Sequence, residues 1–406
     1  MAIGAVLYDN NFSYRKNAIA WVREAELWLS VPRSKSRLTV SGLQIMILLC
    51  IARETTGLGA DLIWITVGSL LRAAISMGFH RDPKRLPRTS LFQEEIHRRL
   101  WNTILEVRQT TCPKVPPVYR SDAIPTAIAL RYMLPVRLHV AKFLNDLNPR
   151  RHQYDEVIQL EVSLRDAYKQ LCKSIQGLQN SSLSPFDSQF LDFIVRRYFL
   201  SLHAPWFGKS LQNAAFAHSR WMVVETATKI WHMVSMDGDL ALFTKCAAGF
   251  FRSVPIQAFL SVAIEILTQL EEDESLGPKT LRPDLLAILH GSRDWSLARV
   301  ETGSTNIKGY MLLCGLIAHI DARRQSLPSE EVHKAFARNV EGALHTCMSV
   351  LQGISQKERP QDEPIEVNDG WEMTGLESVV ADVESFFTFA PGWLVTDTPP
   401  DLTIWQ

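Results

Sequence analysis

The triple His80-Arg81-Asp82 is the arrangement in this sequence that most suggests acid-base chemistry. A histidine beside an aspartate is the pair that general acid-base catalysts and catalytic triads use. Adjacent residues on a turn do not point at one another, however, and no G-x-S-x-G segment or suitable cysteine accompanies them. We therefore expect Arg81 and Asp82 to pair and to cap helix ends, while Pro83 fixes the turn.

The remaining histidines form no stronger arrangement. His97 stands beside Arg98 on a polar helical face, where a histidine is expected to be solvated. The eleven histidines are scattered, and the sequence has no H-E-x-x-H, G-x-G-x-x-G, Walker A or paired-carboxylate motif. We therefore expect no catalytic, cofactor-binding or metal-binding residue, no cofactor and no enzyme activity. The competing interpretation, an enzyme, places His80 or His203 in a pocket.

The six cysteines are too far apart in sequence to form a local zinc site. No C-x₂-C pair exists, and each cysteine stands more than 30 residues from the next (Cys50, Cys112, Cys172, Cys246, Cys314 and Cys347). This spacing is typical of buried thiols in a reducing compartment. The N-terminus lacks the order of a signal peptide, and no apolar run approaches the roughly 18 residues of a membrane span. A soluble intracellular protein without membrane contact is expected.

Charge is distributed unevenly along the 406 residues, although the net charge is zero. No lysine or arginine follows Arg359, whereas ten acidic residues lie between Asp362 and Asp401. The composition, ordinary for a globular protein over residues 1–356, becomes acidic and aromatic over 357–406. Such a tail is typical of disordered activation segments that bind a coactivator groove. The alternative is a tail that folds back and packs Phe386 to Phe389 on the body.

Basic residues form modest patches only. Lys84, Arg85 and Arg88 share one short loop, and three pairs lie on expected helices (Arg98-Arg99, Arg150-Arg151 and Arg196-Arg197). Charged helical faces are common, so direct DNA binding by this chain alone is not expected.

Two helices joined by a compact turn must position the His80 triple. Gly78 stands where a left-handed C-cap can end the first helix, whose apolar residues recur at helical spacing (Trp64, Gly68, Leu71 and Ile75). Ser90 and Gln93 have the spacing of a capping box at the start of the second. One apolar stripe then follows (Phe92, Ile96, Leu100, Ile104 and Val107).

This pair of helices resembles the core of the fungal-specific transcription factor domain, the middle homology region of fungal zinc-cluster activators. The matching residues follow in order (Gly68, Arg72, Ala73, Gly78, Phe79, His80, Arg81, Asp82, Pro83, Ser90, Phe92, Glu95, Arg98, Arg99, Leu100 and Trp101). The resemblance runs from about Ala25 and breaks after Val107, where a few tens of residues of the family pattern are missing. It resumes at Ala127, and later at two further stretches (Arg197 to Trp206 and Glu301 to Tyr310).

Helical periodicity accounts for most of the remaining chain. Helices are expected over 17–30, 39–53, 153–178, 212–236, 241–271 and 330–351. The resemblance implies further helices over 127–147, 190–207 and 311–320. The segment 39–53 is apolar nearly all round, which predicts full burial. Pro205 is expected to end the helix over 190–207, and Asn306 to cap the late helix that contains 311–320. Residues 272–293 are expected to form a charged loop. No strand-period alternation is present, so we predict an all-α array of stacked α-hairpins with an acidic tail.

The resemblance implies a regulatory helical domain over 1–356 and an activation segment over 357–406, without a zinc-cluster DNA-binding module. It implies a nuclear transcription regulator, for instance of a pathway or secondary-metabolite gene cluster. The partners would be coregulators or the transcription machinery, and a small-molecule effector or a homodimer is compatible with the same fold. The alternatives are a structural assembly protein on the same scaffold and, ranked lower, an enzyme.

Overall fold

The computed structural model describes residues 1–10, 12–30, 39–58, 63–83, 90–108, 126–146, 154–176, 184–272 and 281–358. Within these ranges the chain forms fourteen α-helices, one short 3-10 helix and no strand, which confirms the all-α prediction. The acidic segment from 359 to 406 lies outside the described residues. The helices are α1 Ala2–Val6, α2 Arg15–Ser30, α3 Val40–Thr56, α4 Ile63–Ser76, α5 Leu91–Arg108, α6 Thr126–Leu144, α7 Tyr154–Gln176, α8 Pro185–Ser210, α9 Ala217–Ser235, α10 Asp239–Cys246, α11 Phe250–Glu272, α12 Pro283–Glu301, α13 Lys308–Arg324 and α14 Ser329–Glu358.

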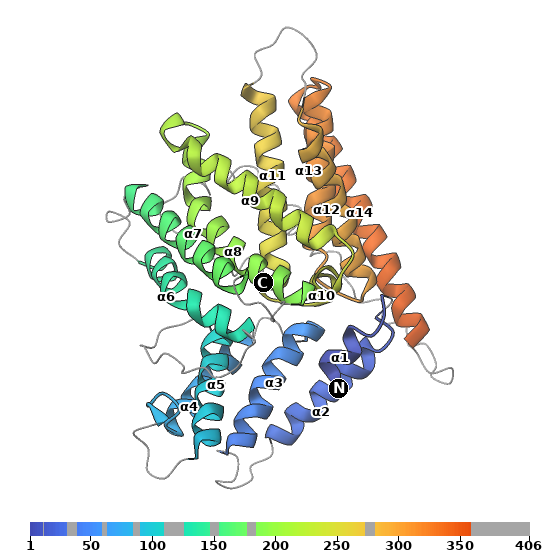
Figure 1. Ribbon diagram of the computed structural model, residues 1–406. Coiled ribbons are helices and arrows are strands. Elements are labelled where there is room, and N and C mark those ends of the chain that lie inside the picture. The colour runs from blue at the N-terminus through green and yellow to red at the C-terminus, as the bar shows by residue number, and fades with distance from the viewer. Residues whose placement is uncertain are drawn as a thin grey trace.

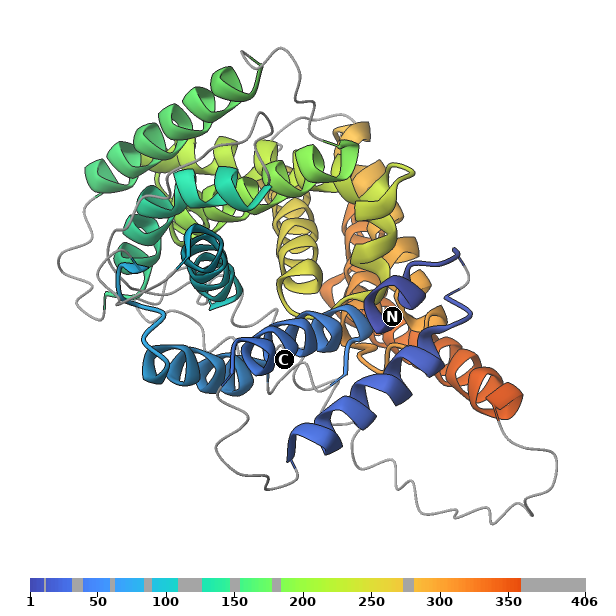
Figure 2. The ribbon, with the colours of Figure 1, turned by 60° about the horizontal axis from the view of Figure 1, so that its bottom comes forward.

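Helices that follow one another in sequence mostly pack side by side, as expected for stacked α-hairpins. The N-terminal helices α1 to α5 lie along one end of the molecule, and α6 to α8 and α9 to α14 rise from it (Figure 1). In the turned view, α2 and α3 come forward and α11 stands behind them (Figure 2). The strongest pairings are those of α13 with α14 and of α8 with α9.

Helix α8 separates two hydrophobic cores. Phe193 and Phe207 face the large core that α8 to α14 share. Ile194 and Leu202 face a second core, formed with α6 and α7. Because α8 is buried on two sides, packing stabilises it past Pro205, and the helix continues to Ser210. The prediction that Pro205 ends the helix is therefore wrong: the proline removes one backbone hydrogen bond, and burial on both sides outweighs that loss.

Helix α11 alone among the described helices has the length and hydropathy of a membrane span, so the expectation that no apolar run approaches that length is wrong. Its residues instead form the centre of the large core, where Phe259, Val262 and Ile266 are fully buried. It packs against α9, α12 and α13. Its apolar character is thus explained by contacts with three neighbouring helices.

Three sequence-based expectations for individual elements are corrected. Much of the segment read as a loop over 272–293 is helical, because Leu285, Ile288 and Leu289 give α12 a buried stripe behind its charged residues. Asn306 does not cap a helix; α13 begins at Lys308 without a side-chain cap. Helix α3 is not buried all round, since Leu48 is 55% exposed.

Candidate functional site

The turn after α4 anchors the His80 triple against α5. Gly78 has φ 83°, the predicted left-handed conformation, and the Phe79 amide donates to the Ala74 carbonyl at 3.0 Å. The Phe79 ring is buried and stacks on the His97 ring, with centroids 4.4 Å apart. The His97 Nε2 atom also lies 3.0 Å from the Phe79 carbonyl oxygen. These contacts fix the turn to α5.

His97 is therefore half-buried, and the expectation that it would be solvated is wrong. Burial lowers the pKa of His97 below its usual value. The His80 ring lies 6.4 Å from the Trp101 ring of α5. His80 thus lies beside α5, whereas His203 lies in α8, so the two histidines belong to different parts of the structure.

The capping box that starts α5 is confirmed. Ser90 Oγ accepts from the Gln93 amide at 3.2 Å, and Gln93 Oε1 accepts from the Ser90 amide at 3.1 Å. The predicted stripes are less accurate at their ends, where Phe92 is 73% and Ile75 41% exposed. The inward faces are instead built from Val67, Leu70, Leu71 and Ala74 of α4 and from Trp101, Ile104 and Leu105 of α5.

A buried ion pair ties α5 to α6. The Arg137 guanidinium is almost fully buried, and its Nη2 donates to the two Glu106 carboxylate oxygens at 2.8 and 2.9 Å. The same nitrogen donates to the Leu130 carbonyl at 2.5 Å. The Arg137 guanidinium also lies 5.7 Å from the Tyr198 ring centre, so it joins three helices.

A second buried polar cluster connects α7, α8 and α9. The Glu161 Oε2 atom lies 2.6 Å from His218 Nε2 and 3.4 Å from His203 Nε2. The other His203 nitrogen, Nδ1, lies 3.0 Å from Ser219 Oγ, which donates to the Tyr154 hydroxyl. The Arg165 guanidinium donates to the second Glu161 oxygen.

The contacts from Ser219 to His203 and from His203 to Glu161 resemble a catalytic triad, with a nucleophile, a base and an acid that orients the base. Ser219 and His203 are completely buried, however, and Glu161 is 2% exposed, so no substrate can reach the hydroxyl. Burial by itself would raise the pKa of Glu161, but the imidazole nitrogens of His203 and His218 outweigh it and lower the pKa to about 2. The cluster is a structural polar network between helices, in which His203 Nε2 approaches Glu161 without completing a hydrogen bond.

A third polar contact joins the N-terminal helices to the rest. The Glu54 carbonyl oxygen accepts from the Ala248 amide at 2.8 Å. A Cβ added to Gly249, which has φ 57°, would lie 2.4 Å from the Glu54 carboxylate. Burial raises the pKa of Glu54 to about 7, although the nearby Arg197 opposes the shift. Arg197 is itself packed over the Phe250 ring, 5.2 Å from its centre.

Arg15 reinforces this junction from α2. Its guanidinium donates to the Thr56 carbonyl at 2.9 Å and to the Thr302 carbonyl at 2.5 Å. Helix α2 is thus fixed to the ends of both α3 and α12. We name the group Arg15, Glu54, Arg197 and Gly249 the N-terminal junction, because it joins α2 and α3 to α8, to the start of α11 and to the end of α12.

Cysteine and metal chemistry is limited in the described part of the chain. Cys50, Cys246 and Cys347 are buried free thiols, and burial raises the pKa of each to about 11. Cys172 and Cys314 are half-buried, and Cys112 lies outside the described residues. No group of three or more potential metal ligands occurs among the residues that the structure describes.

Residues 1–105 match the fungal specific transcription factor domain. The match begins before Ala25, where the resemblance was expected to start. It ends close to Val107, where the sequence predicts an interruption. No solved structure matches the chain.

Similar proteins extend the likeness to nearly the whole chain. Transcription factor lepE of Aspergillus flavus is 29% identical over 87% of this chain and 49% of its own length. Transcription factor opdR of Penicillium oxalicum is 26% identical over 89% of this chain and 54% of its own. Transcription factor asR3 of Sarocladium schorii is 26% identical over 98% of this chain and 54% of its own. This chain therefore spans about half the length of these relatives.

The alignments also bear on the predicted gap. Those with opdR and asR3 extend over 432 and 480 residues, more than the 406 residues of this chain. These relatives therefore carry residues inside the aligned region that this chain lacks. The position of the predicted gap, after Val107, lies largely outside the described residues.

Proposed function

We propose that this chain is the regulatory region of a fungal transcription factor that controls the genes of one pathway. The proposal is carried by the alignment of three proteins named as transcription factors over 87% to 98% of this chain. The fungal transcription factor domain at residues 1–105 supports it. The chain would act in the nucleus, on coregulators or the transcription machinery.

The helical body would act through contacts and effector sensing, not by reading DNA. This sequence contains no C-x₂-C pair from which a zinc cluster could be built. Ser219 and His203 of the histidine cluster are fully buried, which favours a structural role over an enzymatic one. The N-terminal junction would couple α2 and α3, on which the motif-bearing helices α4 and α5 pack, to α8, α11 and α12.

We further propose a division of labour along the chain. Residues 1–356 form the regulatory body, and the acidic, aromatic residues 357–406 recruit a coactivator. The charge difference between the two parts supports this division, because activation segments of this composition keep their aromatic residues accessible by surrounding them with acids.

Fusion to an unrelated DNA-binding domain tests the division. Residues 1–406, 1–358 and 359–406 are each expressed as fusions and compared on one reporter promoter in a fungal host, with equal protein levels verified by immunoblot. We expect activity from the full chain and from 359–406, and a loss of most activity in 1–358. Full activity in 1–358 would refute the assigned role of the tail. Inactivity of all three fusions, together with a stable homodimer, would favour the assembly protein.

A further inference from the structure

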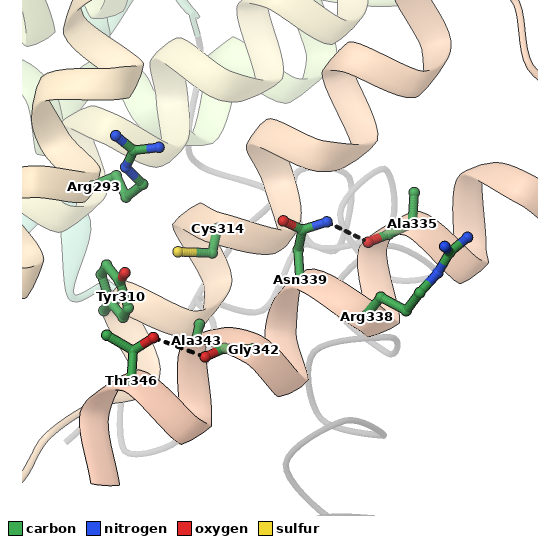
Figure 3. A pocket seen from close by; sticks show the side chains of 9 residues that line it. All are labelled: Arg293, Tyr310, Cys314, Ala335, Arg338, Asn339, Gly342, Ala343 and Thr346. Carbon is green, nitrogen blue, oxygen red and sulfur yellow. Dashed lines mark hydrogen bonds between the residues drawn. The ribbon is translucent and has the colours of Figure 1, made fainter. Parts of the chain in front are cut away.

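A hollow opens between α12, α13 and α14 (Figure 3), and none of its lining residues belongs to the polar clusters described above. Its volume of about 560 Å³ lies within the range of small-molecule sites. Nine residues line it: Arg293 of α12, Tyr310 and Cys314 of α13, and Ala335, Arg338, Asn339, Gly342, Ala343 and Thr346 of α14.

Small side chains on α14 create the space. A Cβ added at Gly342 would meet no atom within 4 Å. Elsewhere between α13 and α14 the packing is tight, because a Cβ at Gly315 of α13 would lie 2.4 Å from the Phe336 ring of α14. The α13 and α14 helices are therefore tightly packed on one side and leave an unfilled hollow on the other.

The hollow favours a negatively charged ligand. Two of its nine lining residues are arginines and none is acidic. Arg293 binds Asp294 in an exposed pair, with side chains 40% and 66% exposed, and such pairs are weak. Arg338 is held loosely, by a 3.3 Å bond to the Lys334 carbonyl and a 3.9 Å approach to Glu331. Either guanidinium can therefore turn to a ligand carboxylate at little expense.

The remaining lining groups suit a flat, largely apolar body. The Tyr310 ring and the Cys314 thiol lie on one side of the hollow and the small α14 residues on the other (Figure 3). The side chains of Asn339 and Thr346 donate to carbonyls of their own helix, at 2.9 Å each. One N–H of Asn339 and the hydroxyl proton of Thr346 are thus already bonded, and a ring that lies against Thr346 leaves no donor of that residue unpaired.

We propose that this hollow binds a small aromatic carboxylate, with its charge at an arginine and its ring beside Tyr310. The inference rests on the proposed function only for its biological meaning, as an effector site. Binding is measured on the purified chain and is therefore independent of the reporter assay. An absence of binding does not contradict the transcriptional proposal, and an absence of reporter activity does not contradict a measured affinity.

Two glycines of α14 provide a matched test. Gly342 lines the hollow and Gly353 does not, yet a Cβ at either would meet nothing within 4 Å. Calorimetric titration with 2-naphthoate is carried out on the full chain, on Gly342→Leu and on Gly353→Leu. We expect the wild type and Gly353→Leu to bind equally and Gly342→Leu to lose binding at least about tenfold. The thermal melting of both variants establishes that they fold.

The charge requirement is tested with a neutral analogue. We expect 2-naphthamide to bind about tenfold more weakly than 2-naphthoate, because it cannot form a charge-assisted hydrogen bond. Substitution of Arg293→Gln together with Arg338→Gln should remove that difference. An absence of 2-naphthoate binding to the wild type overturns the proposal, as does equal binding by the two glycine variants or equal affinity for the acid and the amide.

Discussion

The Arg137 guanidinium donates two hydrogen bonds to the Glu106 carboxylate, at 2.8 and 2.9 Å. The pair bridges α5 and α6, on either side of the stretch where the resemblance to the fungal transcription factor domain is interrupted. Arg137 is buried and Glu106 is mostly buried, with side chains 2% and 16% exposed. The contact therefore holds the motif-bearing helices to the next part of the body across that departure.

We predict that Glu106→Gln lowers the free energy of unfolding by about 2–3 kcal/mol, because it leaves a buried cation without its counter-ion. Urea denaturation of the purified chain measures the change. Glu225→Gln is the control, since its pair with Lys229 is exposed and should contribute about 0–0.5 kcal/mol. Equal losses in the two variants would contradict the role given to Arg137.

Glu161 should make stability fall in acid. Its folded-state pKa of about 2 lies below its ordinary value of 4.5, so its contribution is present above pH 4.5 and is lost as the pH falls toward 2. In urea denaturation the wild type should exceed Glu161→Gln by on the order of 2 kcal/mol at pH 6. That difference should shrink between pH 4.5 and 2. A stability difference between wild type and Glu161→Gln that does not depend on pH would contradict the lowered pKa assigned to Glu161.

Glu54 should behave in the opposite sense. Its folded-state pKa of about 7 lies above the ordinary 4.5, so the folded state holds the proton more tightly than the unfolded state. This group therefore lowers stability as the pH rises from 4.5 to 7. Urea denaturation measures the free energy of unfolding of Glu54→Gln relative to wild type. We expect this difference to rise in favour of the variant by on the order of 1 kcal/mol between pH 4.5 and 8. A constant offset over that range would refute the assignment.

Alanine substitutions at Gly249 and Gly78 allow the cost of backbone strain to be distinguished from the cost of steric crowding. Both have positive φ, 57° and 83°, so alanine at either should lower stability by about 1 kcal/mol. At Gly249 the new Cβ would also lie 2.4 Å from the Glu54 carboxylate, whereas at Gly78 it would meet nothing within 4 Å. Gly249→Ala should therefore lower the melting temperature more than Gly78→Ala does. A larger decrease in melting temperature for Gly78→Ala than for Gly249→Ala would contradict the close contact assigned to Gly249 in the N-terminal junction.

Local signals in the sequence account for much of the fold. The Ser90 and Gln93 spacing and the position of Gly78 predict structures that depend on neighbours within a few residues, and both are observed. The same local reading fails at Pro205, where burial of α8 on two sides outweighs the proline. It fails also at α12, whose buried stripe is hidden among charged residues.

The polar clusters could not be predicted from the sequence. His218 and Glu161 are 57 residues apart, and Arg137 and Glu106 are 31 apart, so no spacing rule connects them. The hollow beside Gly342 depends on the way α12, α13 and α14 pack, which periodicity does not determine. A family resemblance identifies the motif-bearing turn, but it does not indicate which buried groups join that turn to the body.

The central claim, that this chain regulates transcription, is tested most directly by transcript measurement. The full chain is fused to an unrelated DNA-binding domain in a fungal host, and reporter mRNA is measured against the DNA-binding domain alone. We predict a severalfold change in reporter mRNA. An unchanged level, with the fusion shown to be folded, nuclear and bound at the promoter, would contradict the account.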